Sequence, residues 1–324
     1  MKKRERLEAA IHGQKVDRIP IALWRHFPGD DQSPSDLAAA TVAWQRRWDF
    51  DFVKVTPASS FCIRDWGAED VWTGNIEGTR DHTRYPVQRA DDWLNLQPLD
   101  PRTGSLGQQL RCLELIRAEL PDVPIVQTIF NPLSQAKNLA GPSALPSMLR
   151  LYAKQLRRGL ETITATTIEF IRAARLIGVD GIFLAVQHAS ADVLSEAEYR
   201  EFGVEFDLRL LEAARAMWLN VIHLHGERVY FDLVSGYPAH VWNWHDRETY
   251  PNLQQGLAKV SGAVCGGIAR DAALLAGTPQ QVRAEVEDAV KQTGGRRLIV
   301  GTGCVTLIPS PEANLRVARE AVEL

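Results

Sequence analysis

The 324-residue sequence has few cysteines, no long hydrophobic run and no excess of one charge. Lys and Arg total 37, Asp and Glu total 40, and the formal net charge is -3. A strongly basic surface is therefore absent, which argues against nucleic acid or a membrane surface as a partner. The N-terminal stretch MKKRERLEAAIHG lacks the apolar core of a signal peptide, and no apolar stretch reaches the roughly 18–20 residues that span a bilayer. We expect a cytoplasmic protein.

The four cysteines are scattered along the chain and form no CxxC pair. In a reducing compartment such cysteines are expected to be free thiols or metal ligands rather than disulfides. The sequence also lacks a GxSxG motif, the protein-kinase motifs and a dinucleotide-binding fingerprint. The run Gly301-Thr302-Gly303 has neither the lysine nor the strand–loop–helix context of a phosphate loop. Several common enzyme classes are thereby excluded.

Short apolar runs alternate with amphipathic stretches along the whole chain. Eight such runs separated by helices predict an α/β protein with a parallel sheet, and eight is the number of strands in a (β/α)8 TIM barrel. No linker or change of composition marks a second domain, so we predict one barrel domain over residues 1–324. The expected strands are 19–24, 52–57, 124–130, 181–186, 221–225, 240–244, 263–269 and 298–304.

The clearest helices are predicted at 143–177, 195–217, 279–293 and 311–323. Gly178 is expected to end the first, and Ser310-Pro311 to begin the last. The segment between the second and third strands, about 58–120, is too long for a simple crossover. We therefore expect an inserted hairpin or excursion over the mouth of the barrel.

The most informative motif is His223-Leu224-His225 at the end of one expected strand, with Cys304 at the end of another. Residues at i and i+2 of a strand point to the same side, so the two imidazoles should lie together. Two imidazoles and a thiolate suit zinc and leave a fourth position open for a substrate or water. Alternatively, one histidine is a hydrogen-bonded core residue and Cys304 a small buried side chain.

Other polar residues follow the expected strands, where the active sites of this fold lie. Five of the eight histidines are at such positions. We assign candidate catalytic or ligand-orienting roles to three residues, namely Glu227, His188 and Asp246. Candidate substrate-binding residues are Arg25, His26, Asn131, Gln187, His245 and Arg270.

Several segments in chain order resemble the uroporphyrinogen decarboxylase superfamily. They are RERLEAAIHGQKVDRIP (4–20), FVKVTP (52–57), GVDGIFLAVQHAS (178–190) and LIVGTGCVTLIPSPEANLRVAREAV (298–322). The resemblance covers most of the chain and implies a (β/α)8 barrel with a deep cleft. It also makes a homodimer a reasonable expectation. It does not imply one reaction, because members of one fold differ in their sites.

The heme-pathway decarboxylases of this superfamily carry an RQAGRY segment after strand one, whereas the matching stretch, 25–30, keeps only its first arginine. They place an aspartate after strand two, where this chain has Thr56-Pro57. A serine precedes their histidine after strand four, and here Gln187 precedes His188. Their strand eight ends in G-H-G, and here Gly303-Cys304-Val305 follows. These departures argue against a porphyrinogen substrate.

The chain is more similar at these positions to the zinc-dependent methyltransferases of the superfamily. Their H-x-C pattern after strand five corresponds to His223-Leu224-His225, and Cys304 matches their cysteine at the end of strand eight. The resemblance implies Zn²⁺ held by His223, His225 and Cys304, and a methyl group passed between a corrinoid protein, or a small methyl donor, and a thiol or similar acceptor. By residue chemistry alone, an activated thiolate, a polarised oxygen substrate or a zinc-bound hydroxide are all compatible with this site. A porphyrinogen decarboxylase and a non-catalytic ligand-binding barrel remain alternative interpretations.

Overall fold

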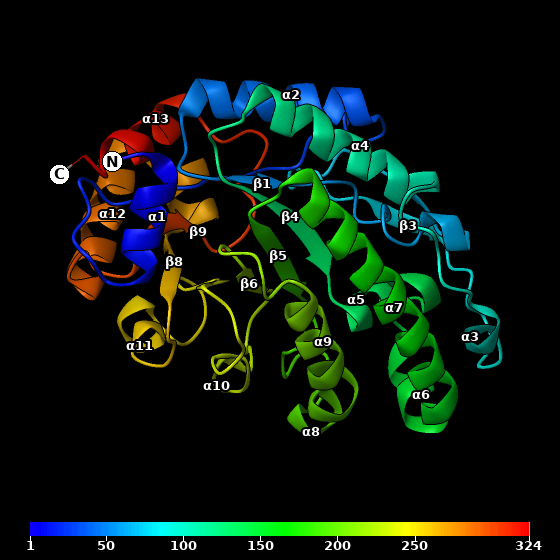
Figure 1. The fold of residues 1–324 in the computed structure, drawn as a ribbon. Helices are drawn as coiled ribbons and strands as arrows, with labels where there is room; N and C mark the ends of the chain where they lie inside the picture. Colours follow the sequence, from blue (N-terminus) through cyan, green and yellow to red (C-terminus); the bar gives the residue numbers. More distant parts are fainter. Residues whose placement is uncertain (324) are drawn as a thin grey trace.

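The structure, a computed structural model that describes residues 1–323, is built on one curled sheet of parallel strands (Figure 1). The strand order is β1-β4-β5-β6-β7-β8-β9, so the strands of this sheet lie side by side in the order in which they occur along the chain. All residues of these strands are buried, because helices cover the outer face while side chains fill the inner one. The strands are β1 (Val53–Val55), β4 (Ile125–Phe130), β5 (Gly181–Val186), β6 (Val221–Leu224), β7 (Val241–Trp244), β8 (Ala263–Ile268) and β9 (Leu298–Thr302).

The predicted first strand, 19–24, is not formed as a strand. Only Ile21 makes a parallel bridge, with Val300 of β9. The Val300 N–H donates to Pro20 O at 2.8 Å, and the Ile21 carbonyl accepts from Asp51 N at 2.9 Å. Pro20 has no N–H to donate, which limits this segment's pairing. The α/β class and the parallel sheet are therefore confirmed, but the sheet has seven strands rather than eight. The segment 20–22 lies between β9 and Asp51, which precedes β1, and is hydrogen-bonded to both.

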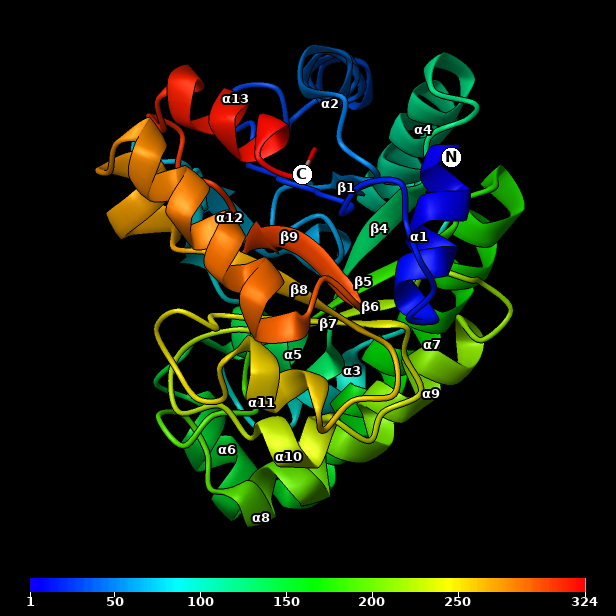
Figure 2. The ribbon, with the colours of Figure 1, turned by 90° about the vertical axis from the view of Figure 1, so that its left-hand side faces the viewer.

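Helices cover the outside of the sheet. Figure 2 shows α12 lying along β8 and β9, which it contacts. Among residues 1–323 no helix combines the length and the apolar character needed to cross a membrane. The main helices are α1 (Lys3–Ile11), α2 (Pro34–Trp48), α4 (Gly104–Glu119), α5 (Pro132–Ala140), α6 (Leu145–Leu151), α7 (Ala153–Ile177), α9 (Glu205–Ala213), α12 (Pro279–Thr293) and α13 (Glu312–Glu320). Short helices are α8 (Glu196–Tyr199), α10 (Phe231–Val234) and α11 (Leu253–Leu257).

The helix predictions are confirmed with three changes. The stretch 143–177 is divided into α6 and α7 at Tyr152, and it ends at Gly178 with φ 97° as expected. The stretch 195–217 becomes α8, a π-helical turn at Arg200–Val204 and α9. Helix α13 begins one residue later than predicted, and the Ser310 hydroxyl does not cap it.

The hairpin expected between the second and third strands is present. It consists of β2 (Glu69–Val71) and β3 (Asp81–Arg84), which pair antiparallel, and is followed by α3 (Asp92–Asn95). Its connecting residues contact loops at the carboxyl rim, because Ile308 N–H donates to Ile76 O at 2.8 Å. A Cβ on Gly78 would lie 2.7 Å from His26 Cβ, so only glycine permits this close approach. The hairpin therefore covers part of the rim at which the site lies.

A buried carboxylate joins the N-terminal segment to the sheet at the opposite end. Asp51 is fully buried and accepts hydrogen bonds from Arg6 at 2.7 Å, Arg18 at 2.8 Å and the Ile21 N–H at 2.8 Å. Asp17 forms an ion pair with Arg6 at the same end of the sheet, at 2.7 Å. These bonds hold α1 and the segment 17–21 against β1.

Replacing Asp51 with asparagine should lower the free energy of unfolding by about 3 kcal/mol, because two buried guanidinium groups lose their shared anion. Urea denaturation would measure this loss. Glu119→Gln is the matched control, since its ion pair with Arg46 is exposed on both sides. Equal denaturation midpoints for the two variants would contradict the structural role given to Asp51.

Candidate metal centre

Four side chains converge at the carboxyl rim of the sheet. The candidate ligand atoms of His223, His225, His245 and Cys304 all lie within 4.8 Å of one another. His223 belongs to β6, His225 follows it, His245 follows β7 and Cys304 comes two residues after β9. Parallel strands end on the same side of a sheet, so residues distant in sequence meet here. We call these four residues the His/Cys cluster.

The ring orientation of His223 is set by Asn243 of β7, its register partner in the sheet. The Asn243 amide group donates to the Cys265 and Thr302 carbonyls at 2.9 and 3.0 Å, which leaves its Oδ1 as an acceptor. His223 Nδ1 lies 2.7 Å from that oxygen and must therefore carry a proton. Its Nε2 is left with a free lone pair, as a metal ligand requires.

His245 is oriented in the same way by a carboxylate. Its Nδ1 lies 2.6 Å from Glu248 Oε2. Its Nε2 is buried and has no hydrogen-bond partner within the described chain, 1–323. Burial opposes the charged ring, but Cys304 and Glu248 outweigh it and raise the pKa of His245 to about 9. The ring must therefore release its Nε2 proton to bind a metal, and Nε2 then becomes a free ligand atom because Nδ1 is engaged with Glu248.

Cys304 supplies the negative charge of the cluster. Burial disfavours its thiolate, but hydrogen bonding and charge from His223, with His225 and His245 beside it, hold the pKa of Cys304 well below its usual range. Its Sγ lies 3.8 Å from His225 Nδ1. One thiolate and three imidazoles, two of them oriented by neighbouring polar groups, fit the ligand chemistry of zinc.

The cluster contains one more donor than the sequence predicted. His245 was predicted to contact substrate, and the structure places it among the candidate ligands as well. Four protein donors complete a tetrahedral zinc site, so a substrate atom would enter as a fifth ligand or displace one of the four. If all four residues bind one ion, His245 would take the fourth position that His223, His225 and Cys304 alone would leave open.

Gly303 makes the approach of Cys304 to His245 sterically feasible. A Cβ at this position would lie 2.6 Å from His245 Cα and 2.9 Å from Trp244 O. Contacts this short force the backbone to move. The glycine before Cys304 is therefore required for the end of β9 to lie against the residues after β7.

A pocket of about 260 Å³ adjoins the cluster at His225. Lys137, Gln187 and His188 line it together with apolar residues of α6 and the loop after β5. Burial lowers the pKa of His188 to about 3, with Lys137 and His225 as further causes, so this ring is neutral. The predicted residues Gln187 and His188 thus lie beside the cluster, as expected from their place after β5.

Four other predicted residues lie away from the cluster or are engaged elsewhere. Asn131 is fully buried and caps the N-terminus of α5. Asp246 accepts from the Gly267 N–H of β8, and burial raises its pKa to about 7. Glu227 is exposed, and Arg25 lies over the rings of Phe27 and Trp44.

Arg270 and His26 lie close enough to Cys304 to interact with its charge. Arg270 pairs with Glu77 of the β2–β3 connection at 2.5 Å. Burial, then Lys54 as a nearby cation, lowers the pKa of His26 to about 3. Both residues are at the rim, between the cluster and the hairpin.

Lys54 and Glu248 also lie close to the cluster, although neither was among the residues predicted from the sequence. Lys54 of β1 is buried, with its Nζ 4.6 Å from the centre of the Phe183 ring, and Phe183 stacks on His223. Burial lowers the pKa of Lys54 to about 7. A lysine within the apolar run FVKVTP was the available signal for the first. Glu248 lies three residues after His245 in a loop, where spacing alone gives no indication of a contact.

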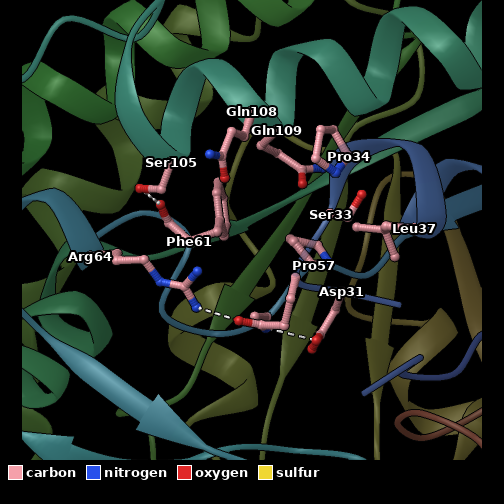
Figure 3. Close-up of a pocket in the computed structure, with 12 residues that line it drawn as sticks. Asp31, Ser33, Pro34, Leu37, Pro57, Phe61, Arg64, Ser105, Gln108 and Gln109 are labelled. Atoms are coloured by element: carbon pink, nitrogen blue, oxygen red, sulfur yellow. Dashed lines mark hydrogen bonds between the residues drawn. The ribbon is translucent and has the colours of Figure 1, made fainter. Parts of the chain in front are cut away.

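A separate small pocket lies between α2 and α4 (Figure 3). Arg64 donates there to Gln32, which donates to Asp31. Ser105 and Gln109 of α4 also line it. No residue of the His/Cys cluster contributes to this pocket, so it is distinct from the candidate metal centre.

The curled parallel sheet with reactive side chains at its carboxyl rim is the architecture of the α/β enzymes that place their sites on strand ends. The uroporphyrinogen decarboxylase (URO-D) family profile matches residues 2–324. The chain belongs to this family.

The curated relatives are named as uroporphyrinogen decarboxylases, whereas a solved structure with the same fold is named as a methyltransferase. A uroporphyrinogen decarboxylase of Xanthomonas axonopodis pv. citri is 26% identical over 317 residues, which cover 88% of this chain and 86% of that protein. For the Xanthomonas campestris enzyme (strain B100), also 26% identical, the match spans 65% of each protein's length.

A methyltransferase from Methanosarcina mazei has the same fold, with a TM-score of 0.88, 19% identity and coverage of 99% of this chain and 98% of that one. A B12-independent methionine synthase from Shewanella sp. W3-18-1 aligns with a TM-score of 0.61 and 13% identity, over 94% of this chain and 92% of that one. At these identities the likeness concerns the fold.

Gly303→Ala should separate Cys304 from His245 and lower the free energy of unfolding by about 1–3 kcal/mol. We expect zinc binding, measured by titration with a chromophoric chelator, to weaken in parallel. Gly236→Ala is the control, because a Cβ there has no atom within 4 Å. Unchanged zinc affinity in Gly303→Ala would show that this close approach is not needed for the site.

Proposed function

We propose that this protein is a zinc-dependent methyltransferase, with zinc bound by His223, His225, His245 and Cys304. The observation that carries the proposal is the convergence of these four donors within 4.8 Å, with the lone pairs of two imidazoles directed by Asn243 and Glu248. The fold shared with a methyltransferase of Methanosarcina mazei supports the same class of reaction.

Zinc, when bound, would lower the pKa of an acceptor thiol and hold it as a thiolate. Other residues would orient the ligands and surround the reacting groups. Asn243 and Glu248 orient two of the ligands, and Arg270 and His26 lie close enough to Cys304 to interact with its charge. The pocket beside His225 is large enough for a small acceptor. The methyl donor in this proposal is a methyl-corrinoid protein or a small methyl compound, and the acceptor is a thiol or a similar nucleophile.

A porphyrinogen decarboxylase is the second candidate, favoured by the activity for which the curated relatives are named. Such a substrate needs an anion facing its pyrrole nitrogens. In this structure β1 instead carries Lys54, whose Nζ lies 3.3 Å from Thr56 Oγ1. A lysine supplies no anion at this place, which disfavours this alternative.

The metal content of purified, untagged protein is the primary test. We expect about one zinc per chain, strongly reduced in Cys304→Ser, His225→Ala and His245→Ala because each removes a ligand. Mass spectrometry of the metal measures the stoichiometry. Cys112→Ser is the control, since Cys112 is buried in α4 away from the cluster. Equal zinc in all four variants, or none in the wild type after zinc is supplied, would contradict the proposal.

Glu248→Gln tests the orientation of His245 separately from the ligands. Loss of the carboxylate should weaken zinc binding about 10- to 100-fold, a typical effect of groups that orient metal-binding histidines. The control is Glu287→Gln, an exposed carboxylate on α12. An unchanged affinity in Glu248→Gln would indicate that His245 does not bind the metal.

The two candidate reactions are separated by substrate. Incubation with uroporphyrinogen should yield no product with fewer carboxylates, whether or not zinc is present. Product analysis by chromatography measures this. Coproporphyrinogen formed at a rate that Cys304→Ser leaves unchanged would establish the decarboxylase alternative.

A further inference from the structure

His188 is connected to a chain of buried polar groups that none of the proposed metal chemistry uses. Ser134 Oγ lies 3.3 Å from His188 Nδ1, and the same hydroxyl bonds to Asn131 Oδ1. The Asn131 amide group donates to Asp207 at 3.0 Å. The hydroxyl groups of Tyr199 and Tyr237 also bond to the Asp207 carboxyl group.

The direction of each hydrogen bond follows from the donors available. The Ser134 backbone N–H donates to Asn131 Oδ1 at 3.2 Å, which fixes the oxygen end of this amide. Its nitrogen end then faces Asp207, an acceptor. Asn131 Oδ1 has no hydrogen to give, so the proton between it and Ser134 Oγ belongs to the serine. Ser134 Oγ has used its only proton and can only accept from His188.

The ring of His188 must therefore be protonated at Nδ1. Because the ring is neutral, Nε2 then carries a lone pair and no proton. Nδ1 is engaged with Ser134, so Nε2 is the nitrogen that remains for a ligand in the pocket that His188 lines. Lys137 lines the same pocket.

We propose that Asp207 is a positioning residue which, through Asn131 and Ser134, holds His188 as the Nδ1–H tautomer and so makes Nε2 a hydrogen-bond acceptor for the substrate. The pocket accordingly selects a small molecule that presents an O–H, N–H or S–H hydrogen to His188. A ligand with only acceptor groups at this point leaves Nε2 unpaired, which costs binding energy in a buried site. The assignment does not depend on zinc and goes beyond the proposed methyl transfer.

The burial of these polar residues supports the view that they act together to position His188. Asp207, Asn131 and Ser134 are all fully buried, although each is polar. Burial raises the pKa of Asp207 to about 7, against the three donors that favour its anion. Asp207 belongs to α9, Asn131 and Ser134 to the start of α5, and His188 to the loop after β5, so three separate elements converge below one pocket.

Nuclear magnetic resonance of protein with isotopically labelled histidine tests the proposal directly. Proton–nitrogen correlations within each ring distinguish the two neutral tautomers, and the His188→Gln variant identifies the signals of His188 by their loss. We expect His188 to be protonated at Nδ1 in the wild type. A wild-type spectrum with His188 protonated at Nε2 overturns the proposal, whatever the zinc content of the sample.

Variants test each link. In Ser134→Ala the acceptor for Nδ1–H is gone, and the Nε2–H tautomer should become the major form. Asp207→Asn should shift the populations in the same direction by a smaller amount. Ser310→Ala removes a buried hydroxyl that has no partner and should leave His188 unchanged. An unchanged tautomer in Ser134→Ala overturns the chain of hydrogen bonds, and an unchanged tautomer in Asp207→Asn alone removes Asp207 from it.

Discussion

The common direction of the seven strands in the main sheet is the constraint on which the rest of this structure depends. Because every strand is parallel to its neighbours, all of them end at one rim, and the curl of the sheet brings those ends together. His223 and Cys304 are 81 positions apart in sequence yet belong to one cluster for this reason. The inner and outer faces of the strands are both buried, so polar residues can remain at the rim without disturbing the core.

The rim combines two kinds of polar network, and each leaves a chosen nitrogen free. In the His/Cys cluster, Asn243 and Glu248 bind Nδ1 of His223 and His245, which leaves Nε2 of each available to a metal. In the pocket, Ser134 binds Nδ1 of His188 and leaves Nε2 for a ligand. In both places, therefore, a hydrogen bond to one ring nitrogen leaves the other nitrogen free to bind a metal or a ligand.

The opposite end of the sheet has a structural network instead. Asp51 gathers Arg6, Arg18 and the Ile21 N–H at the start of β1. This network compensates for the weak pairing of the segment 20–22, which has only one bridge to β9. Binding of α1 to the sheet and the geometry of the rim are thus supported by separate groups at separate ends of the molecule.

Much of the fold followed from the sequence alone, because local pattern determines secondary structure. Seven of the eight expected strands, the long helix ending at Gly178, and the helix 279–293 are determined by runs of apolar residues and by glycine and proline at their ends. The sequence likewise indicated that His223, His225 and Cys304 would meet, since i and i+2 on one strand and the end of another share a rim. Tertiary structure decided the rest. Contacts between elements define the roles of five further residues: His245 as a fourth donor, Glu248 and Asn243 as orienting groups, Lys54 near the cluster and Asp207 in the network behind His188. Such contacts depend on the curl and spacing of the strands rather than on any local pattern.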